Sequence, residues 1–234
     1  MRMLMAALIA LPLAAAAHIA DAATRNIPVP GFVKLRIEGP YTVRVHTGAR
    51  PSVKASGPAA RLDRLLVESR GDTLVISTEK GWSWRSLRWG NEDNVFVDVT
   101  VPALEAAELT GSGDVTIDRV RSSNFTALLT GSGGLSIDRL DASRLAATVT
   151  GSGDLSLAGR TGRADAAVTG SGNIRGTRLV VDLLTASVKG SGDIAIGPTR
   201  VAKAKVTGSG NISIAGRPSC TKTKTGSGEI HCGG

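Results

Sequence analysis

Aromatic and basic side chains gather in one segment of the sequence, EKGWSWRSLRWGNED, which spans residues 79–93. It holds all three tryptophans of the chain and two arginines: Trp82, Trp84, Trp89, Arg85 and Arg88. Tryptophan faces stack on sugar rings or lie among lipid headgroups, and arginines hold carboxylates and phosphates with paired hydrogen bonds. The segment is therefore a candidate ligand-binding loop. The alternative is a hydrophobic lid that folds over the side or end of the protein.

Arginines also recur through the second half of the chain at intervals of 17 to 22 residues: Arg119, Arg139, Arg160, Arg178, Arg200 and Arg217. If these segments stack as strands, the arginines form an edge with a spacing of about 4.8 Å. Such a polyanion edge could hold lipopolysaccharide or an acidic polysaccharide. Asp118 and Asp138 adjoin two of the arginines, so a solvated and partly paired edge is the alternative.

Acidic and amide side chains recur once per repeat, which argues against a catalytic or metal site. They are Asp114, Asp154, Asn173, Asp193, Asn211 and Glu229. Gly134 interrupts this column, and the opposite turn lacks the Gly/Asp pattern of a calcium-binding β-roll. Lyases of the β-helix type cluster their aspartates, and no Ser/His/Asp set is visible here. We expect a solvated ladder, no metal or cofactor, and no enzyme.

The element that would position these residues is a repeated turn. The triplet GSG occurs seven times at steps of 18 to 20 residues, beginning at Gly111, Gly131, Gly151, Gly170, Gly190, Gly208 and Gly226. A period of this size is typical of a solenoid. Because glycine permits positive φ and serine adds little bulk, the triplet is predicted to be a structural turn.

Apolar residues alternate on both sides of each turn, which predicts two strands with one buried face each. Aliphatic residues stand four and six positions after the first glycine of the triplet, as Leu155 and Leu157 do after Gly151. Alanine precedes it by four residues in six successive repeats: Ala107, Ala127, Ala147, Ala166, Ala186 and Ala204. We therefore predict an all-β fold, a single parallel β-helix of flattened two-sheet coils with a thin core. A left-handed hexapeptide helix is excluded because Arg200 and Lys224 occupy its aliphatic positions.

The repeated motif of GSG, then Asp or Asn, then an aliphatic residue resembles a bacterial family, the putative autotransporter adhesins with a head GIN domain. The resemblance covers most of the mature chain and rests on the seven GSG turns, five of which are followed by Asp or Asn. It implies a β-helix of the pectin-lyase type without recognisable catalytic residues, and it implies adhesion as the function.

Cys220 and Cys232 are the only cysteines, and they lie six residues before and six residues after Gly226, the first glycine of the last triplet. Both should point inward from facing strands of one coil, and they should pair if the protein is exported, as its first 22 residues predict. The disulfide requires the core to narrow at its end, since bridged Cα atoms lie about 4.4 to 6.8 Å apart. Lys222 and Lys224 fall in the columns of alanine and valine, and we expect them to cap the core. Metal binding or redox chemistry is the weaker interpretation.

The first 22 residues combine Arg2, an apolar run and Ala20-Asp21-Ala22, which predicts a signal peptide and an exported chain without a membrane span after its removal. Residues 23–106 are expected to form less regular coils of the same helix, or a separate β domain. Residues 107–234 are expected to form the regular GSG-repeat β-helix with its C-terminal disulfide cap.

The net charge of +8 favours anionic partners, and export makes nucleic acid an improbable one. We predict a noncatalytic protein of the periplasm, cell surface or medium that binds glycans, lipopolysaccharide or other anionic envelope polymers. A structural envelope scaffold that assembles through strand edges is the alternative, and a polysaccharide lyase is a weaker one.

Overall fold

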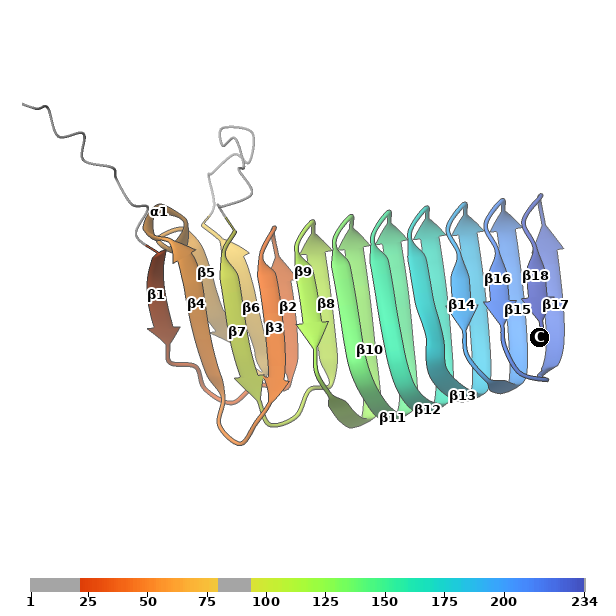
Figure 1. Ribbon diagram of the computed structural model, residues 1–234, viewed down its shortest axis with the longest axis horizontal. Helices are drawn as coiled ribbons and strands as arrows, with labels where there is room; N and C mark the ends of the chain where they lie inside the picture. Colours follow the sequence, from red (N-terminus) through yellow and green to blue (C-terminus); the bar gives the residue numbers. More distant parts are fainter. Residues whose placement is uncertain (1–21, 80–93, 234) are drawn as a thin grey trace, which may run out of the picture.

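The computed structural model describes residues 22–79 and 94–233, which form an all-β solenoid of about six turns (Figure 1). Its 18 strands join in one sheet, which winds into an elongated rod. The helix α1 (Ala59–Leu62) spans four residues. Among the described residues, no helix has the length and apolar character needed to cross a membrane.

Strand bounds follow the repeat in the second half of the chain. The strands there are β8 (Ala106–Gly111), β9 (Asp114–Ile117), β10 (Val120–Gly131), β11 (Gly134–Gly151), β12 (Asp154–Gly170), β13 (Asn173–Gly190), β14 (Ile194–Ile196), β15 (Thr199–Gly208), β16 (Ile212–Ile214), β17 (Ser219–Thr225) and β18 (Ile230–Cys232). They pair in parallel, and Gly131 pairs with both Gly111 and Gly151. The predicted parallel β-helix is confirmed.

The two glycines of each triplet serve different purposes. The first glycine has positive φ in all seven turns, between 114° and 127°. The second has no such φ, contrary to expectation, and is needed for space. The amides of Ser132 and Gly133, for example, both donate to the carbonyl oxygen of Gly111, at 3.0 and 3.1 Å. Successive turns therefore approach so closely that a Cβ on Gly133 would overlap the backbone of Gly113.

The core is a set of aligned columns, as predicted. Ala147 pairs with Ala127 and Ala166, and the column continues to Ala186 and Ala204 with every member at most 4% exposed. The aliphatic columns opposite it are equally buried. Burial of one such aliphatic side chain contributes roughly 1.5–3 kcal/mol. Because each coil covers only its neighbours, this stability accumulates along the rod.

The return side of the middle coils is strand as well, which the expectation of two flat strands per coil did not include. β11, β12 and β13 each run without a break from one GSG turn to the next, over 17 or 18 residues. They bend around a short third side, where Leu140 and Ala142 face the core. The register shifts there, since Ile137 pairs with Leu157 but Leu140 pairs with Gly159.

The N-terminal strands stack in an order that differs from their order in the sequence. They are β1 (Ala22–Ile27), β2 (Lys34–Glu38), β3 (Thr42–Thr47), β4 (Ser52–Pro58), β5 (Leu65–Arg70), β6 (Thr73–Thr78) and β7 (Phe96–Val101). β2 pairs in parallel with both β6 and β8, and β3 pairs in parallel with both β7 and β9. The chain therefore lays its first coil inside the rod (Figure 1). The antiparallel strands β4, β5 and β1 then cover the end.

The C-terminal coil is closed by the predicted disulfide between Cys220 and Cys232, whose Cα atoms are 6.5 Å apart. Lys222 pairs with Ala204 and Lys224 with Val206, so both lysines occupy core columns in the last coil. Both are exposed, because no further strand pairs with β17 among the described residues. Charged ends on core columns disfavour the docking of another apolar coil.

Replacing both Cys220 and Cys232 with serine is expected to loosen this last coil alone. Loss of a cross-link that closes a loop of this size costs about 2 kcal/mol. Amides of β17 and β18 should then exchange with solvent about 30-fold faster in hydrogen-exchange mass spectrometry. Amides of β11 and β12 are the internal control and should keep their rates. Equal acceleration along the whole rod would contradict this assignment.

Candidate functional site

The short third side of the coils carries a concave surface rich in charged residues. We call it the return edge, and it comprises residues 119–124, 139–144, 158–163, 178–183 and 198–201. Adjoining shallow grooves run along it, one with a volume of about 730 Å³. Two aspartates, Asp141 and Asp182, line these grooves together with seven arginines: Arg119, Arg121, Arg139, Arg144, Arg160, Arg163 and Arg200. The excess of positive charge makes the return edge a candidate anion-binding surface.

One aspartate of the return edge is already neutralised by an arginine. Asp141 and Arg160 pair on neighbouring strands, and Arg160 donates from Nε at 3.1 Å and from Nη2 at 2.9 Å. These hydrogen bonds lower the pKa of Asp141 and raise the pKa of Arg160. Arg121, which pairs with Asp141 from the other side, lowers the same pKa through its charge. Asp141 therefore stays ionised at neutral pH and lies between the cationic side chains of Arg121 and Arg160.

The neighbouring column of the return edge places two arginines side by side. Arg144 and Arg163 are direct partners on β11 and β12, and both are exposed. Arg163 Nε lies 3.7 Å from a carboxylate oxygen of Asp165, and no ion pair of Arg144 is found among the described residues. Like charges directly opposite each other on parallel strands are destabilising. An anionic group held between Arg144 and Arg163 would relieve this repulsion.

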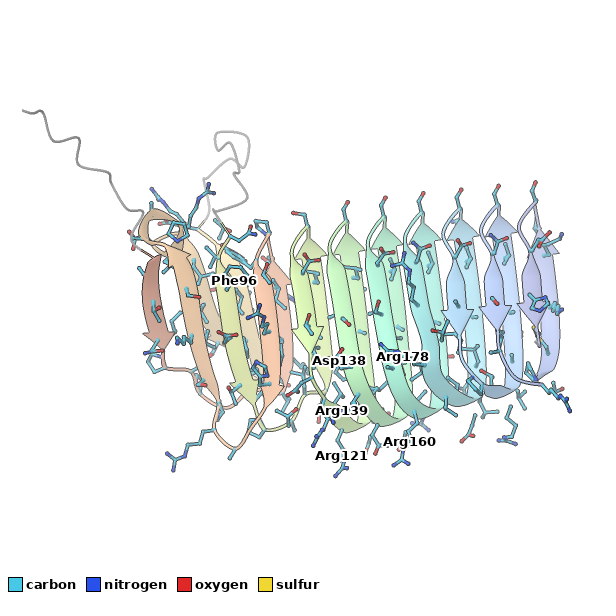
Figure 2. The ribbon with its side chains drawn as sticks, viewed as in Figure 1. Phe96, Arg121, Asp138, Arg139, Arg160 and Arg178 are labelled. Carbon is cyan, nitrogen blue, oxygen red and sulfur yellow. A yellow bond between two sulfur atoms is a disulfide. The ribbon has the colours of Figure 1, made fainter. Side chains whose placement is uncertain are left out.

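The six arginines expected to form one file do not do so. The register shift puts Arg160 beside Asp141 instead of beside Arg139, and Arg178 beside Ala158. Arg119, Arg139, Arg160 and Arg200 still line the grooves, whereas Arg178 and Arg217 line none of them. Figure 2 shows Arg121, Arg139 and Arg160 projecting from the lower edge of the rod. The single file is therefore corrected to a broader arginine-rich strip.

Arg121, Arg144 and Arg163 were missed because positions were counted forward from each triplet. Counting backward from the following triplet gives their true alignment, since the insertion lies before the return edge. Seven residues before a triplet stand Asn124, Arg144, Arg163, Leu183 and Val201, which are partners in register. A backward count could have identified this column from the sequence.

The opposite edge, at the GSG turns, carries a hydrogen-bonded ladder of acids and amides. Asn173 Nδ2 donates to Asp154 at 2.8 Å, and Asn211 Nδ2 donates to Asp193 at 3.0 Å. The amide of Glu229 donates to Asn211 Oδ1 at 3.0 Å. Alternation of acid and amide keeps carboxylates apart and satisfies backbone donors. Within the described residues no three His, Cys, Asp or Glu side chains form a group suited to a metal ion.

The tryptophan-rich candidate site lies outside the described residues: Trp82, Trp84, Trp89, Arg85 and Arg88. Among the described residues that follow it, Phe96 at the start of β7 is 37% exposed. The guanidinium carbon of Arg44 lies 5.7 Å from the centre of its ring, a cation–π contact (Figure 2 labels Phe96).

Comparisons with known proteins agree with this architecture. Residues 31–218 match the model of the family described as putative auto-transporter adhesin, head GIN domain. A crystal structure of a putative adhesin from Bacteroides fragilis is similar, with 26% identity, a TM-score of 0.83, and coverage of 90% of this chain and 96% of that chain. A putative lipid binding protein from Parabacteroides distasonis has 20% identity and a TM-score of 0.70, with coverage of 91% of this chain and 97% of that one. No curated protein matches the chain.

Proposed function

Since the chain belongs to the family of putative autotransporter adhesins with a head GIN domain, we propose that it is a noncatalytic, exported binding module of the cell envelope. Its ligand is an anionic envelope polymer, such as lipopolysaccharide or an acidic polysaccharide, and the return edge is the surface that binds it. The tryptophan-rich segment, residues 79–93, stays a second candidate contact from the sequence.

The observation that carries this proposal is the adjacency of Arg144 and Arg163 in the grooves of the return edge. Arginine binds carboxylates and phosphates with two hydrogen bonds, and a polymer with repeated charges can contact several arginines of a straight rod at once. The structure itself gives Arg144 no counter-ion among the described residues. Neighbouring like charges repel each other, and a bound anion that contacts both arginines would remove this repulsion.

Replacing Arg144 and Arg163 together with alanine is expected to weaken binding to polygalacturonate or lipopolysaccharide about tenfold, because two charge-assisted contacts are lost. The affinity of the mature protein can be measured by biolayer interferometry at two salt concentrations. Higher salt should weaken binding of the unmodified protein, since exposed charges are screened.

The matched control removes two exposed lysines beside the GSG turns, Lys189→Ala with Lys205→Ala, and changes the net charge equally. If both double variants lose the same affinity, total charge is responsible and the return edge is not the site. A variant with Trp82, Trp84 and Trp89 changed to alanine reports on the tryptophan-rich segment in the same assay. Loss of binding only in that variant would move the site there.

A further inference from the structure

Exposed aliphatic side chains concentrate at the C-terminal end of the return edge. Val180 is 49% exposed, Leu183 41% and Val201 39%, and they make up three of the five large exposed hydrophobic residues among the described ones. Leu183 and Val201 are direct partners on β13 and β15. Pro198, also exposed, precedes Val201 by three residues. We call Val180, Leu183, Pro198 and Val201 the aliphatic patch.

The aliphatic patch continues the two arginine-bearing columns of the return edge. Val180 pairs with Arg160, and Leu183 pairs with Arg163. Arg200 lies next to Val201 in sequence and lines the same groove as Leu183. Along the rod, the return edge therefore changes from basic to aliphatic over neighbouring strands, with Asp182 as an acid within the patch.

We propose that the return edge docks on an anionic lipid surface. This inference rests on the proposed function and narrows its ligand to the lipid part of the envelope. The aliphatic patch enters the headgroup layer, and Arg144, Arg163 and Arg200 bind the lipid phosphates. Apolar side chains beside cations are the combination that binds membrane interfaces, because burial and charge attraction act together.

Two other occupants fit the return edge less well. A soluble polysaccharide would use the arginines but would leave three aliphatic side chains in water. A second copy that docked through its own return edge would set two surfaces with an excess of arginine against each other. A patch of four small side chains is also far below the roughly 1,200 Å² that a stable protein interface buries.

The shape of the molecule suits contact with a plane. The return segments of successive coils line up along one side of a straight rod, which appears as the lower edge of Figure 1. Their arginines and aliphatic side chains can thus reach a flat surface together. No conformational change is required, because parallel pairing already fixes the columns.

The experiment uses the mature protein and vesicles in a co-sedimentation assay. Vesicles of phosphatidylglycerol mixed with phosphatidylcholine should bind the protein, and pure phosphatidylcholine vesicles should bind it at least tenfold less. Changing Val180, Leu183 and Val201 to serine should weaken binding to the mixed vesicles about tenfold or more, because buried apolar area is lost. The control Leu66→Ser removes an aliphatic side chain of similar exposure on β5 and should have no effect.

The same variants measured on soluble polygalacturonate separate this inference from the proposed function. The triple serine variant should bind polygalacturonate like the unmodified protein, whereas Arg144→Ala with Arg163→Ala should lose both ligands. Binding of the polymer without binding of mixed vesicles would overturn the lipid inference and leave the proposed function standing. Loss of neither ligand in the double arginine variant would overturn both. If the triple serine variant bound mixed vesicles as well as the unmodified protein does, charge alone would account for binding and the role of the aliphatic patch would be disproved.

Discussion

The Gly192→Ala variant is expected to lose about 3 kcal/mol of unfolding free energy, although it adds a single methyl group. Gly192 is the second glycine of its turn, and a Cβ there would overlap the backbone carbonyl oxygen of Gly172. It would also lie 2.8 Å from Cγ1 of Val168. Neither the carbonyl nor the valine can move without disturbing the turn hydrogen bonds or the core. Chemical denaturation followed by circular dichroism measures the loss.

The matched control is Gly31→Ala, because a Cβ on Gly31 meets nothing within 4 Å and its φ is not positive. Its unfolding free energy should change by less than about 0.5 kcal/mol. A small effect of Gly192→Ala would mean that the turns do not stack as closely as described. In that case GSG would need another explanation, such as ligand contact.

The Phe125→Ala variant is expected to lose about 4 kcal/mol of unfolding free energy. Phe125 is 1% exposed and is the largest fully buried side chain among the residues that the structure describes. Its column continues with Leu145, Ala164 and Leu184, so large side chains of neighbouring coils pack against it. A cavity at Phe125 cannot collapse, because main-chain pairing holds the neighbouring coils at a fixed spacing.

Phe96→Ala is the comparison, since Phe96 is 37% exposed and packs on Arg44. Its loss should cost less than about 1 kcal/mol. Both variants remove the same side chain, so the difference between them isolates the core contribution. Equal losses in urea unfolding would contradict the assignment of Phe125 to the core.

Sequence periodicity was sufficient to predict the regular coils, because each core column takes an apolar residue from every coil at the same position. Alanine four residues before each triplet could be read directly, and Ala147 pairs as expected with Ala127 and Ala166. The return edge was harder, because coils of 18 to 20 residues place their length differences just before it. A forward count from each triplet places Arg139 and Arg160 close together, whereas the pairing makes Arg144 and Arg163 direct partners and sets Arg160 beside Asp141.

The N-terminal order was beyond the reach of periodicity. Apolar and polar residues alternate in β2 and β3 as in the other strands, and this pattern does not predict that β2 lies between β6 and β8 or β3 between β7 and β9. That choice depends on long-range pairing, such as Lys34 with Ala106. The sequence also did not reveal why the second glycine of each triplet is needed. A positive φ explains any glycine in a turn, whereas the close contact with the preceding turn is visible only in the structure.

The placement of β2 and β3 between later strands makes the two ends of the rod unequal under load. The C-terminal end can peel one coil at a time, beginning with the coil that the disulfide closes. At the N-terminal end, β2 cannot leave until both β6 and β8 release it. Tension on the N-terminus can release β1, which pairs only with β4, but it must then break the pairing of β2 on both sides at once, so this end resists unfolding more than the other.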